Sequence, residues 1–307
     1  MYASRSHHKA IVARVSQMPD WRPMLKSRSN GIPRIMGVLN VTPDSFHINS
    51  RVKNSKDAIS RALEMYKDGA DWIDIGGEST RPGAQRVSSD EELDRVIPTI
   101  KSIRDRIPDL CISIDTSKAI VAAKAIEAGA DMINDISSLS DPEMGKVIMD
   151  YGSPVCLMHM QGIPENMQNN PNYVNTVNEV RDELSTSVNK LLNMGVNSES
   201  IIVDPGIGFG KNLNHNIELL IAGREIVPND NISLLWGVSR KSIFRELLGR
   251  DNTDDRLPGT LGVAAISINK GVDIVRVHDV QEHSDLFKTM HSLMNKGNVV
   301  KRSANGK

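Results

Sequence analysis

The chain has 307 residues, of which 39% are hydrophobic and 24% are charged, and its formal net charge at pH 7 is −1. This composition is that of an ordinary globular protein, and the length permits one large barrel or two ordinary domains. The near-neutral charge argues against nucleic acid or an anionic membrane as a chain-wide partner, and no stretch approaches the roughly 20 apolar residues of a membrane span.

Both ends of the chain are expected to lie outside the main fold. Residues 1–33 contain basic residues but no apolar signal-peptide core, so we interpret them as an N-terminal extension that is disordered or loosely packed. An organelle transit segment stays open, because residues 1–17 hold no acidic residue. Residues 295–307 form a polar tail. Cys111 and Cys156 lie in apolar runs, which favours buried thiols in a reducing compartment and hence a cytoplasmic protein.

Between these ends, short apolar runs alternate with helical patterns. Four helical patterns stop at a glycine, which accepts the left-handed conformation just past a helix end. Each is followed by an apolar run that suits a strand buried on both faces of a parallel sheet. The expected strands are 35–39, 72–75, 111–114, 132–134, 154–158, 201–204, 233–238 and 274–277, and the helical segments between them include 55–67, 90–106, 118–127, 173–193, 214–227 and 259–270.

Eight strand–helix units in a chain of this length predict a single-domain (β/α)8 TIM barrel over residues 34–294. A doubly wound sheet is the alternative, but it would need a glycine-rich first turn for a nucleotide, and none follows the first strand.

Polar residues lie at or just past the carboxyl ends of all eight expected strands. One Asp in such a place is more often a helix cap, but eight strands that end alike indicate a site at the face where TIM barrels carry their catalytic groups. The residues are Asn40, Asp74, Asp115, Asn134, His159, Asp204, Ser239 and Arg276.

The loops after these strands carry recognisable motifs. They include Asn-Val-Thr-Pro-Asp-Ser-Phe at 40–46, Asp-Ile-Gly-Gly-Glu-Ser-Thr-Arg-Pro-Gly at 74–83, Ser-Ile-Asp-Thr at 113–116, Asp-Pro-Gly-Ile-Gly-Phe-Gly-Lys at 204–211, Ser-Arg-Lys-Ser at 239–242 and Arg-Val-His at 276–278. From about residue 35 to 290, the sequence closely resembles the dihydropteroate synthase family. The resemblance implies a diphosphate-releasing transferase of folate biosynthesis, which condenses (7,8-dihydropterin-6-yl)methyl diphosphate with 4-aminobenzoate to give 7,8-dihydropteroate.

The resemblance also implies roles for individual residues, and each role suits the chemistry. Carboxylates and amides can pair with the guanidine-like edge of a pterin, and cations stabilise the charge of departing diphosphate. The implied pterin ligands are Asp115, Asn134, Asp204 and Lys241; the diphosphate ligands are Asn40, Arg276 and His278; the catalytic residues are Lys241, Arg276 and His278; and the 4-aminobenzoate pocket uses Thr80, Arg81, Pro82, Phe46, Phe209 and Ser242. The family further implies a Mg²⁺ ion bound by Asn40 and diphosphate oxygens, and a homodimer.

The first loop departs from the family pattern. After Ser-Phe the family usually continues Ser-Asp-Gly-Gly, whereas this chain reads His47-Ile48-Asn49-Ser50. The usual Asp is absent, and the loss of two glycines stiffens the loop. The resemblance therefore leaves the closure of this loop and the identity of the aromatic amine open.

Other functions remain open at this point. A pterin-dependent methyltransferase shares the barrel and the pterin contacts but has no use for a diphosphate pocket. A non-catalytic pterin-binding protein would fit the altered first loop. A phosphosugar barrel enzyme is supported by fold analogy alone.

Overall fold

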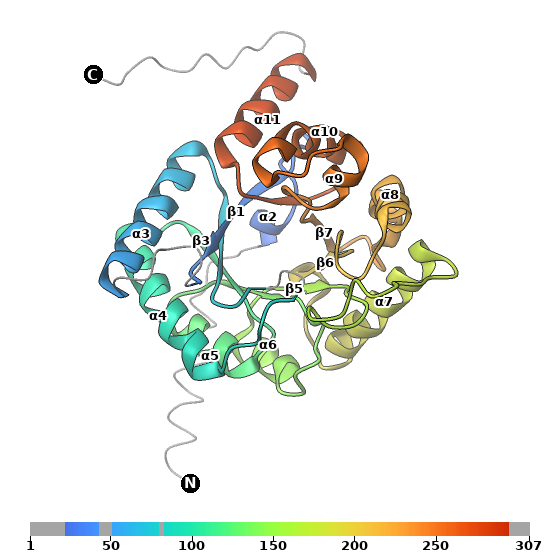
Figure 1. The fold of residues 1–307 in the computed structure, drawn as a ribbon. Helices are drawn as coiled ribbons and strands as arrows, with labels where there is room; N and C mark the ends of the chain where they lie inside the picture. Colours follow the sequence, from blue (N-terminus) through green and yellow to red (C-terminus); the bar gives the residue numbers. More distant parts are fainter. Residues whose placement is uncertain (1–21, 43–50, 80–82, 295–307) are drawn as a thin grey trace, which may run out of the picture.

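The computed structural model describes residues 22–42, 51–79 and 83–294, of which 51–56 by their backbone alone. Eight parallel strands pair in chain order and close into a barrel, with the helices arranged around it (Figure 1). The predicted TIM barrel is therefore confirmed. The strands are β1 (Arg34–Asn40), β2 (Trp72–Gly76), β3 (Cys111–Asp115), β4 (Met132–Asp135), β5 (Val155–Met158), β6 (Ile201–Asp204), β7 (Ser233–Trp236) and β8 (Ile274–Val277).

The helices follow the predicted segments, with additions. The segment predicted as one helix over 214–227 divides at Gly223, whose φ of +55° breaks the α-helical backbone. The patterns did not single out α6, α9 or α11. The α-helices are α2 (Arg22–Leu25), α3 (Arg51–Asp68), α4 (Ser89–Arg106), α5 (Ala119–Ala128), α6 (Met144–Tyr151), α7 (Thr176–Asn193), α8 (Leu213–Ala222), α9 (Ile243–Leu248), α10 (Leu257–Ser267) and α11 (Val280–Met294), with 3-10 turns η2 (Ser198–Ser200), η3 (Gly223–Ile226) and η4 (Thr253–Arg256).

The strands are apolar on both faces because each face packs against a different layer. One face packs outward on the helices, and the other fills the barrel, as expected for alternating side chains on a closed parallel sheet. The lower interior holds one buried cluster of Met36, Trp72, Cys111, Met132, Cys156, Ile202, Leu235 and Ile274, together with Leu25.

The chain before β1 closes the floor of this barrel. Leu25 of α2 is fully buried in the interior cluster, and the indole nitrogen of Trp72 donates to the carbonyl of Met24 at 2.9 Å. Lys26 donates to the carbonyl of Ile232 at 3.0 Å. For residues 22–33 the interpretation as a loosely packed segment is therefore wrong. Residues 1–21 and the predicted tail 295–307 lie outside the described residues, and the domain boundaries stay a prediction.

An acidic residue stands directly before β2, β4 and β8 and performs the same task each time. Its carboxylate accepts the backbone N–H of a residue at or near the start of the preceding strand, at 2.8 to 3.0 Å, and pairs with an arginine. The fourth repeat carries Asn197 instead, which caps η2. The pairs are Asp71 with Arg28 and Arg34, Asp131 with Arg104, and Asp273 with Arg224.

Among the described residues, none of the helices combines the length and the apolar character that crossing a membrane would require.

Candidate active site

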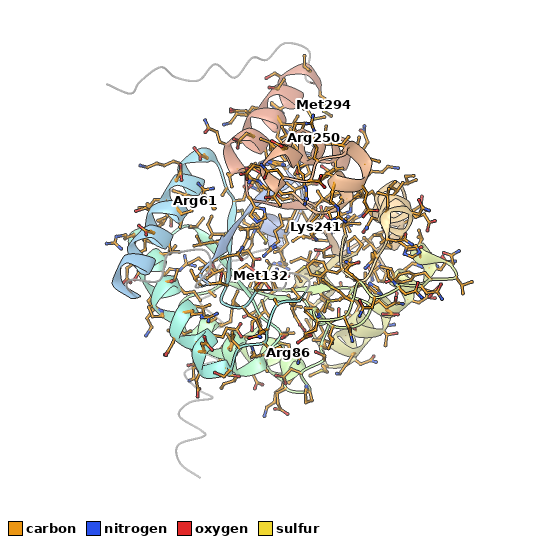
Figure 2. All side chains as sticks on the ribbon, viewed as in Figure 1. Arg61, Arg86, Met132, Lys241, Arg250 and Met294 are labelled. Atoms are coloured by element: carbon orange, nitrogen blue, oxygen red, sulfur yellow. The ribbon has the colours of Figure 1, made fainter. Side chains whose placement is uncertain are left out.

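The alternation that fills the barrel with apolar groups below places polar groups at its carboxyl-terminal mouth. Asp74 lies two residues after Trp72, Asp115 follows Cys111 by two such steps, and Asn134 lies two residues after Met132. A period of two keeps these side chains on the interior face of their strands. Figure 2 shows Lys241 toward the middle of the ring of helices, whereas Arg61, Arg86 and Arg250 lie toward its perimeter.

The centre of the mouth is an ionic cluster around Arg276. Its Nε donates to Asp74 Oδ2 at 2.6 Å, and its Nη2 donates to Asp115 Oδ2 at 2.7 Å. Asn134 Nδ2 also donates to Asp74 Oδ2, at 3.0 Å. Asp74 is fully buried, and its Oδ1 has no hydrogen-bond partner among the described residues. A buried acceptor without a partner is costly, so this oxygen indicates a place for a donor that comes with a ligand or water.

Burial also changes the protonation of this cluster. Desolvation raises the pKa of Asp115 to about 7, against the opposing effect of the Arg276 guanidinium. Burial lowers the pKa of the Arg276 guanidinium, but the carboxylates of Asp74 and Asp115 together outweigh that effect and raise it. The guanidinium therefore stays charged. The centre of the mouth therefore holds a permanent cation beside a carboxyl group that titrates near neutrality.

Asp204, at the end of β6, and Lys241, in the loop after β7, form a second polar group near Arg276. Asp204 Oδ1 accepts the backbone N–H of Gly206 at 2.8 Å. The other oxygen, Oδ2, would lie 3.4 Å from a Cβ placed at Gly237, and Lys241 Nζ would lie 3.9 Å from the same point. Glycine at 237 therefore keeps the space beside both charged atoms open. Burial raises the pKa of Asp204 and lowers that of Lys241 to about 8.

Lys241 also contacts the loop after β6. Its Nζ donates to the carbonyl of Ile207 and lies 4.3 Å from the centroid of the Phe209 ring. An ammonium over an aromatic face is a favourable cation–π arrangement. Phe209 thus borders the same space as Lys241 and Asp204.

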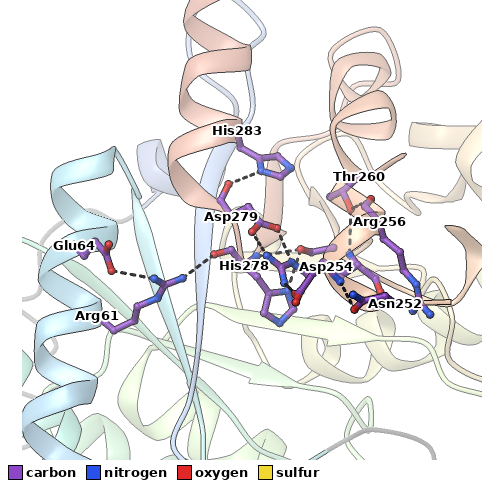
Figure 3. Close-up of polar contacts among 11 residues, drawn as sticks. Arg61, Glu64, Asn252, Asp254, Arg256, Thr260, His278, Asp279 and His283 are labelled. Carbon is purple, nitrogen blue, oxygen red and sulfur yellow. Dashed lines mark hydrogen bonds and ion pairs between the residues drawn. The ribbon is translucent and has the colours of Figure 1, made fainter. Parts of the chain in front are cut away.

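The loop after β7 contacts the end of β8, where Figure 3 shows His278 and Asp279 next to each other. His278 Nδ1 lies 3.0 Å from the Ser239 hydroxyl, which also accepts the His278 backbone N–H at 3.1 Å. In the same loop, Arg240 has a φ of +57°, and its Nε donates to Asp279 Oδ2 at 2.9 Å. Asp279 lies next to His278 in the chain, so this ion pair and the serine hydroxyl together orient the histidine.

Asn40 ends β1, the strand that pairs with β8 in the closed barrel. A Cβ placed at Gly76 would lie 3.5 Å from Asn40 Oδ1 and 3.7 Å from Asp115 Oδ2, so these two side chains flank Gly76. Ser242 precedes α9 and is exposed at the rim, beside Lys241 in the chain. Among the described residues no group of three or more His, Cys, Asp or Glu side chains could hold a metal ion.

The structure therefore brings together most of the residues that the sequence singled out. Asn40, Asp115, Asn134, Asp204, Phe209, Lys241, Ser242, Arg276 and His278 lie at or beside one mouth, whereas Phe46, Thr80, Arg81 and Pro82 lie outside the described residues. Their roles as ligands stay predictions. Sequence reasoning assigned no role to Asp74 or Gly237, although the period of two places Asp74 inside the barrel just below Gly76.

Comparisons with known proteins agree with this arrangement. The model of the pterin binding enzyme family matches residues 36–278. The dihydropteroate synthase of Haemophilus influenzae is 42% identical over 264 residues, which cover 86% of this chain and 95% of that protein. The dihydropteroate synthase of Escherichia coli K12 is 43% identical over 262 residues, which cover 85% of this chain and 92% of that protein.

The similar solved structures include several dihydropteroate synthases. That of Yersinia pestis, in complex with a sulfonamide drug, has a TM-score of 0.81 and 41% identity, and covers 87% of this chain and 96% of that chain. That of Xanthomonas albilineans with 4-aminobenzoic acid has a TM-score of 0.79 and 36% identity, over 86% of this chain and 94% of that chain.

A third structure, that of Burkholderia cenocepacia in complex with 7,8-dihydropteroate, has a TM-score of 0.78 and 39% identity, over 86% of this chain and 92% of that chain.

Three observations agree on the family of this chain. They are the set of polar groups at the barrel mouth, the family model that matches most of the barrel, and relatives above 40% identity along nearly their whole length. The chain belongs to the pterin binding enzymes and, among them, to the dihydropteroate synthases of folate biosynthesis.

Proposed function

We propose that the barrel mouth joins (7,8-dihydropterin-6-yl)methyl diphosphate to 4-aminobenzoate, with release of diphosphate. The observation that carries the proposal is the pairing of the Asp74–Asp115–Arg276 cluster with Asp204 and Lys241 around a space kept open by Gly237. The solved relatives that bind 4-aminobenzoic acid and 7,8-dihydropteroate support these substrates.

The pterin ring lies between the two polar groups. Asp204 accepts from its guanidine-like edge through Oδ2, a charge-assisted bond that is stronger than one between neutral groups. Asp115 and Asn134 bind the rest of the ring, and Lys241 donates to its carbonyl or to a ring nitrogen. The unpartnered Oδ1 of Asp74 supports a further polar contact beneath the ring.

The diphosphate lies toward β1 and β8. Arg276 and His278 alternate at the end of β8 and present positive charge or N–H donors to one side. Arg276 gives Nε and Nη2 to carboxylates, so Nη1 is the nitrogen that remains for the diphosphate. Asn40 offers an amide oxygen, which is a suitable ligand for Mg²⁺ when most of the other ligands are phosphate oxygens and water. When bound, the ion neutralises charge on the leaving diphosphate.

The reaction needs no covalent enzyme intermediate. The amine nitrogen of 4-aminobenzoate forms a bond to the exocyclic methylene of the pterin, and the bond from that carbon to the diphosphate oxygen breaks. The diphosphate leaves with the electron pair, and the amine gives up one proton. Arg276, His278 and Lys241 stabilise the negative charge that develops on the leaving group.

The second substrate enters above the pterin. Phe209 borders the aromatic ring, and Ser242 binds the carboxylate; the resemblance adds Phe46, Thr80, Arg81 and Pro82, which lie outside the described residues. The Mg²⁺ ion, a homodimer and a cytoplasmic location belong to the same proposal, and the family resemblance supports them.

Diphosphate release tests the proposal. Purified protein is given the dihydropterin diphosphate, Mg²⁺ and 4-aminobenzoate, and the product mass is read in parallel. We expect release that depends on the amine, formation of 7,8-dihydropteroate, and loss of activity with EDTA that added Mg²⁺ restores. An Asn40→Ala variant is expected to need more Mg²⁺ for half-maximal rate. Tight pterin binding without any product would contradict the proposed reaction with this amine.

A further inference from the structure

The loop after β6 that carries Phe209 is held by its own carbonyl groups. Surface loops usually leave many carbonyls to water. Here five consecutive carbonyls, from Gly206 to Gly210, each accept a hydrogen bond from the protein. The donors are, in order, the Phe209 backbone N–H at 3.0 Å, Lys241 Nζ, Gln168 Nε2 at 2.6 Å, Lys211 Nζ at 2.9 Å and the Tyr173 hydroxyl at 2.9 Å.

Two of these donors belong to residues 161–173, the Asn- and Pro-containing segment between β5 and α7. The backbone of this segment, at Gln161, and that of His159 just before it lie directly against the loop after β6. A Cβ at Gly206 would lie 1.8 Å from the carbonyl oxygen of His159, and one at Gly210 would lie 2.4 Å from that of Gln161. Both glycines also have positive φ, of +66° and +60°. The two loops therefore pack backbone against backbone at positions that only glycine permits.

Lys211 connects these loops from below. It is 3% exposed, and its Nζ lies 2.9 Å from His159 Nδ1, 2.9 Å from the Phe209 carbonyl and 3.4 Å from the His159 carbonyl. None of these partners is a carboxylate, and burial lowers the pKa of Lys211 to about 7. Burying a lysine without a carboxylate partner costs desolvation energy. What Lys211 contributes to the structure is therefore its hydrogen bonds to the two loops.

His159 connects Lys211 to Glu183 of α7. Its Nδ1 lies 2.9 Å from Lys211 Nζ and accepts when that amine donates, which leaves the proton of a neutral ring on Nε2. Nε2 lies 3.0 Å from Glu183 Oε2, an ion-pair distance without hydrogen-bond geometry. Glu183, His159, Lys211 and the Phe209 carbonyl thus form a chain from the outer helix to the mouth. Its last member sets the backbone from which the Phe209 ring extends toward Lys241.

We propose that Lys211 is a positioning residue for the second substrate: together with the 161–173 segment it holds the Phe209 ring where 4-aminobenzoate binds. The inference rests on the proposed function, in which Phe209 borders the aromatic amine. Pterin binding depends on the side chains of Asp115, Asn134 and Asp204. Among the described residues, the side chains of Glu183, His159 and Lys211 do not hydrogen-bond these three side chains; the backbone N–H of His159 donates to the backbone carbonyl of Asp204 at 2.9 Å, and a replaced Lys211 side chain leaves that bond in place. The two substrates therefore respond differently when Lys211 is replaced.

Steady-state kinetics of Lys211→Met test this. Removal of the ammonium leaves the Phe209 carbonyl and His159 Nδ1 without their donor, and we expect the KM for 4-aminobenzoate to rise roughly tenfold. The Kd of 6-hydroxymethylpterin, read by its fluorescence, is expected to change less than about twofold. Tyr173→Phe removes one hydroxyl from the same loop and is expected to raise the same KM by roughly threefold.

Lys270→Met is the matched control. Lys270 also donates to a backbone carbonyl, that of Ile221, but at the far end of α10, and we expect all its kinetic constants to match those of wild type. A Lys211→Met variant with wild-type turnover and an unchanged KM for 4-aminobenzoate would overturn this inference and leave the proposed function standing. A loss of pterin affinity as large as the rise in that KM would do the same. A wild type that forms no dihydropteroate would contradict the proposed function first. If Lys211→Met shows no cooperative melting transition, the KM of Tyr173→Phe decides.

Discussion

At the scale of single residues, the mouth concentrates charge in a place of low exposure. Asp115 and Asp204 are nearly buried, and Arg276 compensates two carboxylates at once. Burial moves the pKa of Asp115 up and that of Lys241 down, so both approach neutrality from opposite sides. Groups tuned in this way are typical of functional sites.

These shifts predict a bell-shaped pH dependence of kcat/KM for the pterin diphosphate. The Asp115 carboxylate is available above a pKa of about 7, so activity rises as pH increases through that value. The Lys241 ammonium is lost above a pKa of about 8, so activity falls again beyond it. In Asp115→Asn the acid limb is expected to vanish, and in Lys241→Met the basic limb. An unchanged acid limb in Asp115→Asn would assign that titration to another group.

Gly237 predicts a steric effect at the same site. A methyl group at this position would lie 3.4 Å from Asp204 Oδ2, an ordinary contact for the protein but one that occupies the proposed ring space. Gly237→Ala is therefore expected to weaken the binding of 6-hydroxymethylpterin at least roughly tenfold with little change in Tm. Gly262→Ala, where a Cβ meets nothing within 4 Å, is the control. Equal affinities of the two variants would place the pterin elsewhere.

At the scale of elements, the acidic residues before β2, β4 and β8 fasten each strand to the one before it. Asp131 accepts the Ile112 N–H at 2.8 Å and the Arg104 guanidinium at 2.5 Å, and Arg104 also donates to the carbonyls of Leu110 and Gly129. The paired side chains of Arg104 and Asp131 thus join the end of α4, the start of β3 and the turn before β4.

Asp131→Ala breaks this junction and leaves a half-buried Arg104 without its carboxylate. We expect a loss of about 3 kcal/mol in the free energy of unfolding, since a charged hydrogen-bond partner and a backbone acceptor are removed together. Urea denaturation measures the effect. Asp285→Ala, at an exposed ion pair with Lys288, is expected to change stability by less than about 0.5 kcal/mol. Equal stabilities of the two variants would show that the junction contributes nothing.

At the scale of the whole molecule, the barrel separates stability from chemistry. Its floor is apolar and is closed by α2, whereas its mouth is lined by polar groups. The two ends are joined by the same eight strands, because residues that alternate along each strand fill the interior in layers. Changes at the floor should therefore affect folding without altering the site.

Leu25→Ala tests this separation. Leu25 is fully buried in the interior cluster, so the change is expected to cost about 2–5 kcal/mol of unfolding free energy. The KM values for both substrates are expected to stay at wild-type levels below the melting temperature. Leu293→Ala, at a residue that is 77% exposed, serves as the control for stability. An altered KM in a folded Leu25→Ala protein would show that floor and mouth are coupled.

The sequence by itself determined the strand order, the fold class and the candidates for the mouth. The physical reason is local. A strand buried on both faces needs a short apolar run, a helix end favours glycine, and the first polar residue after such a run has to lie at the carboxyl edge of the sheet. These rules use neighbouring residues only, and all eight strands were predicted from them.

Only the tertiary structure decided which of those residues meet. Arg276 and Asp74 are 202 positions apart and become ion-pair partners because the barrel closes β8 onto β1 beside β2. Leu25 became part of the core because the barrel floor is open until α2 covers it. Lys211 received a role because the loop after β6 packs against the one after β5. Spacing along a chain contains no distance across a barrel, so these contacts had to come from the closed fold.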